Sequence, residues 1–203
     1  MAAPLLNQRT DLDRLFAALI PTFEEEHRPG GIAAAAALRR ARSQPYRGFQ
    51  ATADPKSLLE TVCTQPGALA VAASILACRS LIAWSNWTGE GLADDLSSGL
   101  YTAELIGPDG HIVDDNVRIG LLISDAAIDY PMSRHSGEET YIVISGVAEW
   151  SVDNGPYITK APGSLIHHPA WVPHGRRTSK EPFLGAWRWS GDLDLSSFSV
   201  DRV

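Results

Sequence analysis

The spacing of hydrophobic residues changes near the middle of the chain. Before about residue 85, apolar side chains recur every three or four positions, as Leu12, Leu15, Phe16 and Leu19 do. This spacing is typical of helices that bury one face. Proline and glycine interrupt it at several points, including Pro66-Gly67. The sequence therefore predicts about three to five helices in this half.

The second half has the pattern of short strands. From Leu100 onward, β-prone runs are separated by turn-forming stretches such as Pro108-Asp109-Gly110 and Pro162-Gly163. Glycine tolerates positive φ and proline presets φ, so these stretches favour tight turns. Strands at this spacing indicate an antiparallel sandwich or barrel. We expect a helical segment over residues 1–95 that packs on a β-barrel over residues 96–203.

One predicted strand carries polar groups among its apolar ones, in the run "EETYIVISG". Because side chains alternate between the faces of a strand, Glu139, Tyr141, Val143 and Ser145 are expected on one face. His135 lies four residues before Glu139, across a glycine. A turn there would bring the imidazole back over the carboxylate.

A second stretch, "PGSLIHHPAWVPHGRR", covers residues 162–177. Prolines on both sides of its centre would hold His174 rigidly at a strand edge, as a metal ligand requires. His167 and His168 are adjacent, so at most one points inward, and His168 is expected to support the site rather than bind metal. His111 follows Pro-Asp-Gly and is expected at an exposed turn.

The first of these stretches resembles the first motif of the cupin superfamily, G-x5-H-x-H-x3-E-x6-G. His135, three residues, Glu139, six residues and Gly146 match it. The chain departs from the pattern at two positions, since Ser133 stands where the first histidine would be and Ala127 replaces the first glycine.

The second stretch resembles the second cupin motif, through Gly163, Pro169 and His174. The resemblance implies a mainly β protein with a C-terminal antiparallel cupin β-barrel, or jelly roll, after an N-terminal helical segment. It leaves His135, Glu139 and His174 as two imidazoles and one carboxylate. That set suits one divalent ion (Fe²⁺, Zn²⁺, Mn²⁺ or Ni²⁺) with open positions for substrate.

A narrower resemblance is to the cupin-type dimethylsulfoniopropionate (DMSP) lyases. It is carried by the "GAWRWSGDLD" run, the helical segment before the barrel, and five residues: Tyr130, His135, Glu139, Tyr141 and His174. It implies that the two histidines and the glutamate hold the metal, with Tyr141 close to it or on it. It also implies that Tyr141 is the base in a β-elimination that gives dimethyl sulfide and acrylate, the reaction of a carbon–sulfur lyase of the dimethylpropiothetin dethiomethylase type. Tyr130 is the competing candidate.

The substrate of that family is a zwitterion with a sulfonium group and a carboxylate. Aromatic faces bind sulfonium cations through cation–π attraction. Trp187 and Trp189 alternate onto one face of their predicted strand with Arg188 on the other, so we expect the two tryptophans, with Tyr130, to bind the substrate. Other aromatic residues that would add walls are Trp84, Trp87, Tyr101 and Trp171.

Composition narrows the function classes. The formal charge of −7 over 203 residues argues against nucleic-acid binding, which needs clustered basic residues. The two cysteines, Cys63 and Cys78, lie in apolar sequence and are expected to be buried thiols. Neither a signal peptide nor a membrane span is predicted, so we expect a cytoplasmic monomer or homodimer.

Two other functions fit the same scaffold. An Fe(II) cupin dioxygenase uses the same ligand set, although a tyrosine at the metal would take the place of oxygen. A non-catalytic cupin that binds a small ligand is favoured by Ser133. A sugar-phosphate isomerase is disfavoured, because Arg118 is the one basic residue expected inside the barrel.

Overall fold

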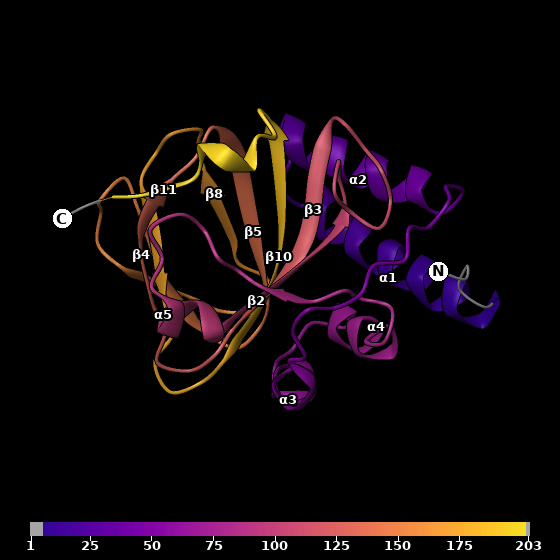
Figure 1. Cartoon of the computed structure of the whole chain (residues 1–203), viewed down its shortest axis with the longest axis horizontal. Helices are drawn as coiled ribbons and strands as arrows, with labels where there is room; N and C mark the ends of the chain where they lie inside the picture. The colour runs from indigo at the N-terminus through magenta and orange to yellow at the C-terminus, as the bar shows by residue number, and fades with distance from the viewer. Residues whose placement is uncertain (1–5, 202–203) are drawn as a thin grey trace.

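A helical layer covers one side of a β-barrel (Figure 1). The structure is a computed structural model that describes residues 6–201. Within this range no helix has the length and apolar character that crossing a membrane requires. The predicted fold class, a mainly β protein with an antiparallel barrel preceded by helices, is confirmed.

Four helices precede residue 85 in the described chain, which agrees with the predicted number. They are α1 (Leu6–Glu24), α2 (Pro29–Ala41), α3 (Lys56–Thr64) and α4 (Val71–Ala77). A short fifth helix, α5 (Asp94–Ser98), leads into the barrel. Pro21 lies inside the last turn of α1 rather than splitting it. Pro29 opens α2, where its missing N–H would have no helical partner.

The strands form two sheets. In the order in which they lie side by side, the larger sheet contains β1 (Ser85–Asn86), β2 (Leu100–Ile106), β3 (Val117–Ser124), β10 (Phe183–Gly191), β5 (Gly137–Ser145) and β8 (Leu165–His168). The smaller sheet contains β11 (Ser199–Val200), β4 (Asp129–Arg134), β9 (His174–Arg177), β6 (Ala148–Val152) and β7 (Ile158–Lys160). The named strands pair antiparallel throughout.

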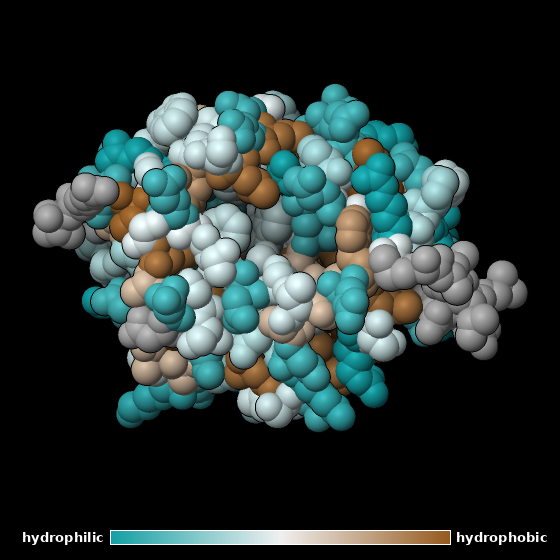
Figure 2. All heavy atoms as spheres, in the orientation of Figure 1, coloured by the Kyte–Doolittle hydropathy of each residue, from teal (hydrophilic) through white to brown (hydrophobic). Residues whose placement is uncertain are grey.

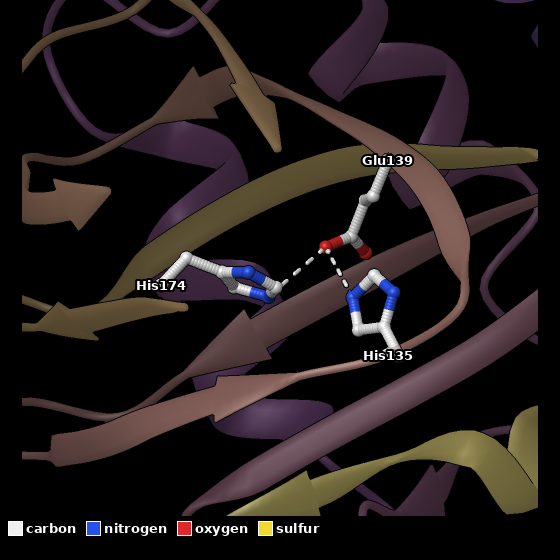
Figure 3. A group of neighbouring side chains, drawn as sticks. All are labelled: His135, Glu139 and His174. Carbon is white, nitrogen blue, oxygen red and sulfur yellow. Dashed lines mark ion pairs between the residues drawn. The ribbon is translucent and has the colours of Figure 1, made fainter. Parts of the chain in front are cut away.

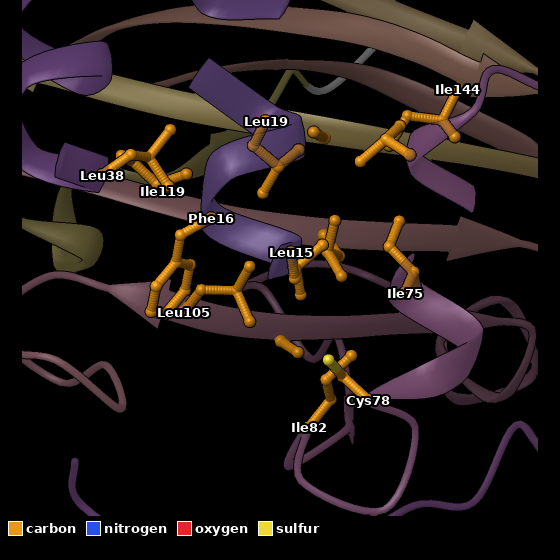
Figure 4. Packing of buried hydrophobic residues seen from close by; sticks show 14 of the residues in the cluster. Leu15, Phe16, Leu19, Leu38, Ile75, Cys78, Ile82, Leu105, Ile119 and Ile144 are labelled. Atoms are coloured by element: carbon orange, nitrogen blue, oxygen red, sulfur yellow. The ribbon is translucent and has the colours of Figure 1, made fainter. Parts of the chain in front are cut away.

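The outer face of the larger sheet is buried under the helices. Leu15, Phe16 and Leu19 of α1 belong to the same apolar cluster as Ile119 of β3 and Ile144 of β5 (Figure 4). Both cysteines are buried free thiols on this side, as the sequence predicted. The face visible in Figure 2 is mostly hydrophilic, with hydrophobic residues in small groups.

The inner face of the same sheet lines the barrel, and strand alternation decides which side chains point there. Glu139 and Tyr141 face inward, whereas Thr140 bonds to Glu26 in the helical layer. The expectation for Ser145 was wrong, because its hydroxyl bonds to Gln65 at the end of α3. A register shift between β5 and β10 near this end of the strand interrupts the alternation.

Candidate active site

Three side chains predicted as ligands converge inside the barrel. His135 comes from the turn between β4 and β5, Glu139 from β5, and His174 from the start of β9. The Nε2 atoms of His135 and His174 lie 3.3 Å and 3.7 Å from Glu139 Oε2 (Figure 3). The candidate ligand atoms all lie within 4.8 Å of one another, and all three residues are buried.

The backbone orients both imidazoles. Nδ1–H of His135 donates to the Gly137 carbonyl at 2.9 Å, and Nδ1–H of His174 donates to the Val172 carbonyl at 2.9 Å. Each Nε2 therefore carries its lone pair toward the centre, as in metal sites where a histidine's other nitrogen is held by a carbonyl. Burial lowers the pKa of His174 well below its usual value, which keeps it in the neutral form that binds metal. This donor set fits a divalent cation.

Glu139 is held at both of its oxygens. Oε1 accepts a hydrogen bond from Trp189 Nε1 at 2.8 Å. Oε2 faces the imidazoles of His135 and His168. Burial alone would raise the pKa of Glu139, but the neighbouring imidazoles of His135 and His168 hold it well below its ordinary value. The carboxylate is therefore ionised at neutral pH.

His168 has the supporting position that the sequence indicated. Its Nδ1 lies 2.9 Å from Glu139 Oε2, and β5–β8 pairing places the two residues directly opposite each other. Its ring stacks on that of His174, with centroids 3.9 Å apart. Burial lowers the pKa of His168, so the neutral ring donates Nδ1–H to the carboxylate.

A cavity beside these residues brings together all the side chains proposed for catalysis and substrate binding. It is lined by Tyr130, Tyr141, Trp187 and Trp189 as well as the three candidate ligands. Trp87, which follows β1, also lines it.

Three of the aromatic residues expected as additional walls lie elsewhere. Trp84 is buried in the apolar cluster under the helices, and Tyr101 packs against that cluster. Trp171 is 54% exposed. Each is therefore absent from the lining of this cavity.

The two tyrosines are buried phenols. Tyr130 accepts a hydrogen bond from Trp87 Nε1 at 3.0 Å, and burial raises the pKa of Tyr130 to about 12. Burial, reinforced by the Glu139 carboxylate, raises the pKa of Tyr141 well above 10, while the positive charge of Arg176 opposes this rise.

Arg176 is one of the cavity residues that the sequence interpretation missed, as is Trp150. Arg176 is 3% exposed and lines the cavity, on the same strand face as His174 two positions earlier. Arg118, which was expected inside the barrel, instead bonds to Glu104 and Asp109. Side chains two positions apart on a strand share a face, so the inward position of His174 would have predicted that Arg176 also points inward.

The family of this chain is shown by comparison with known proteins. The family model for dimethylsulfoniopropionate lyase matches residues 56–185, well over half of the sequence. This chain belongs to the DMSP lyase family. The resemblance drawn from the sequence motifs is thereby confirmed.

Two DMSP lyases in the comparisons resemble this chain along nearly its whole length. It is 27% identical to the dimethylsulfoniopropionate lyase DddQ of Ruegeria pomeroyi, over 92% of this chain and 94% of that one. The crystal structure of the Ruegeria pomeroyi DddQ superimposes with a TM-score of 0.71 at 25% identity, covering 93% and 96% of the two chains. A structure from a study of the DMSP lyases RdDddP and RnDddQII gives a TM-score of 0.74 at 24% identity, over 96% and 100%, and supports the fold.

Proposed function

We propose that this protein cleaves DMSP to dimethyl sulfide and acrylate, as a carbon–sulfur lyase. Family membership supports the reaction class. The observation that carries the proposal is the placing of Tyr141 in the same cavity as the His135, Glu139 and His174 cluster. Removal of a weakly acidic α-proton needs a base to take the proton and a nearby cation to stabilise the charge that develops.

We propose that these three residues hold one divalent ion, Fe²⁺, Zn²⁺, Mn²⁺ or Ni²⁺, with Tyr141 close to it or on it. The lone pairs of two oriented imidazoles and an ionised carboxylate support this assignment. When bound, such an ion supplies Lewis-acid stabilisation of the charge that develops on the substrate carboxylate and favours ionisation of a nearby phenol.

Tyr141 is the proposed base. Its phenolate takes the proton from the carbon next to the carboxylate, and the electron pair of that C–H bond forms the C=C bond of acrylate. The C–S bond breaks at the same time, and its electron pair leaves with dimethyl sulfide. Arg176, whose charge lowers the pKa of Tyr141, favours the phenolate. Tyr130 lines the same cavity and is the rival base.

The cavity suits a small substrate. It offers about 50 Å³ to the centres of water-sized molecules. This space is larger than a single buried water needs, which is roughly 10–15 Å³. Trp187 and Trp189, together with Tyr130, supply aromatic walls for the sulfonium group.

We further propose that the chain divides into the helical segment 1–95 and the barrel 96–203, and that it acts in the cytoplasm as a monomer or homodimer. The unpaired, buried thiols of Cys63 and Cys78 support a reducing compartment. A small zwitterionic substrate needs neither nucleic acid nor membrane as a partner.

Gas chromatography tests the activity. The purified protein is incubated with DMSP and each of the four metals in turn, and dimethyl sulfide is measured in the headspace, with His174→Ala as control. We expect release with at least one metal and little with the variant. Absence of dimethyl sulfide with every metal would overturn the proposal, and oxygen consumption on a carboxylate substrate would favour the dioxygenase instead.

A further inference from the structure

Arg176 lies at the centre of an aromatic cluster. Cross-strand pairing places Tyr130 of β4 on one side of it and Trp150 of β6 on the other. The guanidinium carbon lies 5.1 Å from the ring centroid of each. It also lies 5.8 Å from the ring of Tyr141 and 5.6 Å from that of Phe183. These contacts fix the guanidinium within the cavity wall.

The other buried arginines of the described chain have carboxylate partners. Arg118 pairs with Glu104, and Arg188 pairs with Glu26. Arg176 is the third buried arginine of the described chain, and no described carboxylate forms an ion pair with it. Burying a charge without an opposite charge costs free energy, so an anion bound beside Arg176 would be stabilised there.

The hydrogen-bond donors of Arg176 that lack a partner lie on the same edge of its guanidinium group. Its Nε and Nη2 atoms are buried and have no hydrogen-bond partner among residues 6–201. These two nitrogens share one edge of the guanidinium plane, and their N–H groups point the same way. Two parallel donors of this kind match the two oxygens of a carboxylate.

We propose that Arg176 binds the carboxylate of the substrate through Nε–H and Nη2–H, and so selects carboxylates over neutral analogues. This inference rests on the proposed function, which supplies the identity of the substrate. Trp187 and Trp189 of β10 line the same cavity, so the sulfonium end lies against these tryptophans when Arg176 holds the carboxylate. Arg176 thus orients the substrate as well as attracting it.

Binding of an inert ligand pair tests the inference apart from turnover. Propionate and propionamide have the same shape and differ in charge, and ligand-observed NMR titration gives the Kd of each, with metal-loaded and with metal-free protein. We expect Arg176→Gln to weaken propionate binding about 10- to 100-fold, since two charge-assisted hydrogen bonds are lost. Propionamide binding should change little.

Arg177→Gln is the matched control, because Arg177 is the next residue on β9, is exposed and bonds to Glu149. This variant removes the same charge outside the cavity and should bind propionate like the parent. Arg176→Lys keeps the positive charge but lacks the two parallel N–H donors, so its affinity for propionate should fall between those of the parent and Arg176→Gln. It also carries the test if the glutamine variant does not fold.

Equal loss of propionate and propionamide binding in the Arg176 variants would overturn the inference, because a structural role affects both ligands. Equal binding of the two ligands by the parent protein would overturn it too. Failure of the proposed function has a different signature. In that case propionate is still preferred in an Arg176-dependent way, but no dimethyl sulfide forms from DMSP.

Discussion

The Glu139 carboxylate accepts a hydrogen bond from the indole N–H of Trp189, and a single conservative substitution, Trp189→Phe, removes it. Trp189→Phe keeps an aromatic ring against His135, on which the indole stacks with centroids 4.0 Å apart. It deletes the hydrogen bond of 2.8 Å to Oε1. Glu139 is 4% exposed, so this oxygen would lose its donor where water has little access.

The size of the effect follows from that contact. A hydrogen bond to a charged group contributes about 1.5–3 kcal/mol. Residues that hold a metal ligand in place typically contribute about 10- to 100-fold in metal affinity, which is roughly 1.4–2.7 kcal/mol. The two ranges overlap, so we expect Trp189→Phe to weaken metal binding about 10- to 100-fold while the fold is retained.

Competition with a chelating dye measures the metal affinity of each variant. Trp187→Phe is the matched control, because its indole N–H donates to the Leu121 carbonyl on β3 at 3.2 Å and does not touch Glu139. A Trp189→Phe protein that binds metal as tightly as the parent would refute the reasoning. Trp189→Ala removes the ring as well, and should raise KM further if the ring binds the sulfonium, by an amount worth about 0.5–2 kcal/mol.

Three further predictions follow from the site and its surroundings. Alanine at His135, Glu139 or His174 should remove most bound metal and activity, and full metal retention by His174→Ala in elemental analysis would contradict the ligand assignment. Tyr141→Phe should lower kcat about 10²–10⁴-fold with metal retained, as loss of a general base does. Tyr130→Phe is measured beside it, and a Tyr141→Phe protein that turns over DMSP within a few-fold of the parent would show that Tyr141 is not the base. Burial lowers the pKa of His111, so the unfolded chain binds a proton first and the free energy of unfolding should fall as the pH drops below about 6.5. His111→Gln should reduce that slope in urea unfolding between about pH 7.5 and 5.5, and an unchanged slope would contradict it.

Much of the site could be predicted because it lies on regular strands. Alternation along β5 predicted that Glu139 and Tyr141 face the same way, and alternation along β10 predicted the same for Trp187 and Trp189. Both pairs line the cavity. The sequence could not show that Trp189 lies directly opposite Glu139, because register between strands far apart in the chain depends on the whole sheet.

Two errors arose from treating polar residues as exposed. Arginine in a strand is usually exposed, which is why Arg176 was missed although His174 set its direction. His111 follows a turn signal, yet it is 1% exposed. Its Nδ1–H donates to the Arg47 carbonyl at 2.8 Å, and its Nε2 accepts from the Ala83 N–H at 3.1 Å. A neutral imidazole thus satisfies two backbone groups of other segments, which local sequence does not reveal.

The helical layer has a structural connection to the site through the outer face of β5 and β10. Arg188, fully buried on β10, bonds to Glu26 in the turn between α1 and α2, and Glu26 also accepts from Thr140 of β5 at 2.7 Å. Gly30 lies so close to the guanidinium that any side chain there would overlap it.

Arg188 and Thr140 are direct cross-strand partners, one position away from Trp189 and Glu139, which are partners on the inner face. A slip of one residue would turn every side chain to the opposite face. Breaking a buried ion pair by removing one partner costs about 3–5 kcal/mol, so Glu26 opposes such a slip strongly. The same register that buries Arg188 under the helices therefore places the indole of Trp189 against the carboxylate proposed to bind the metal.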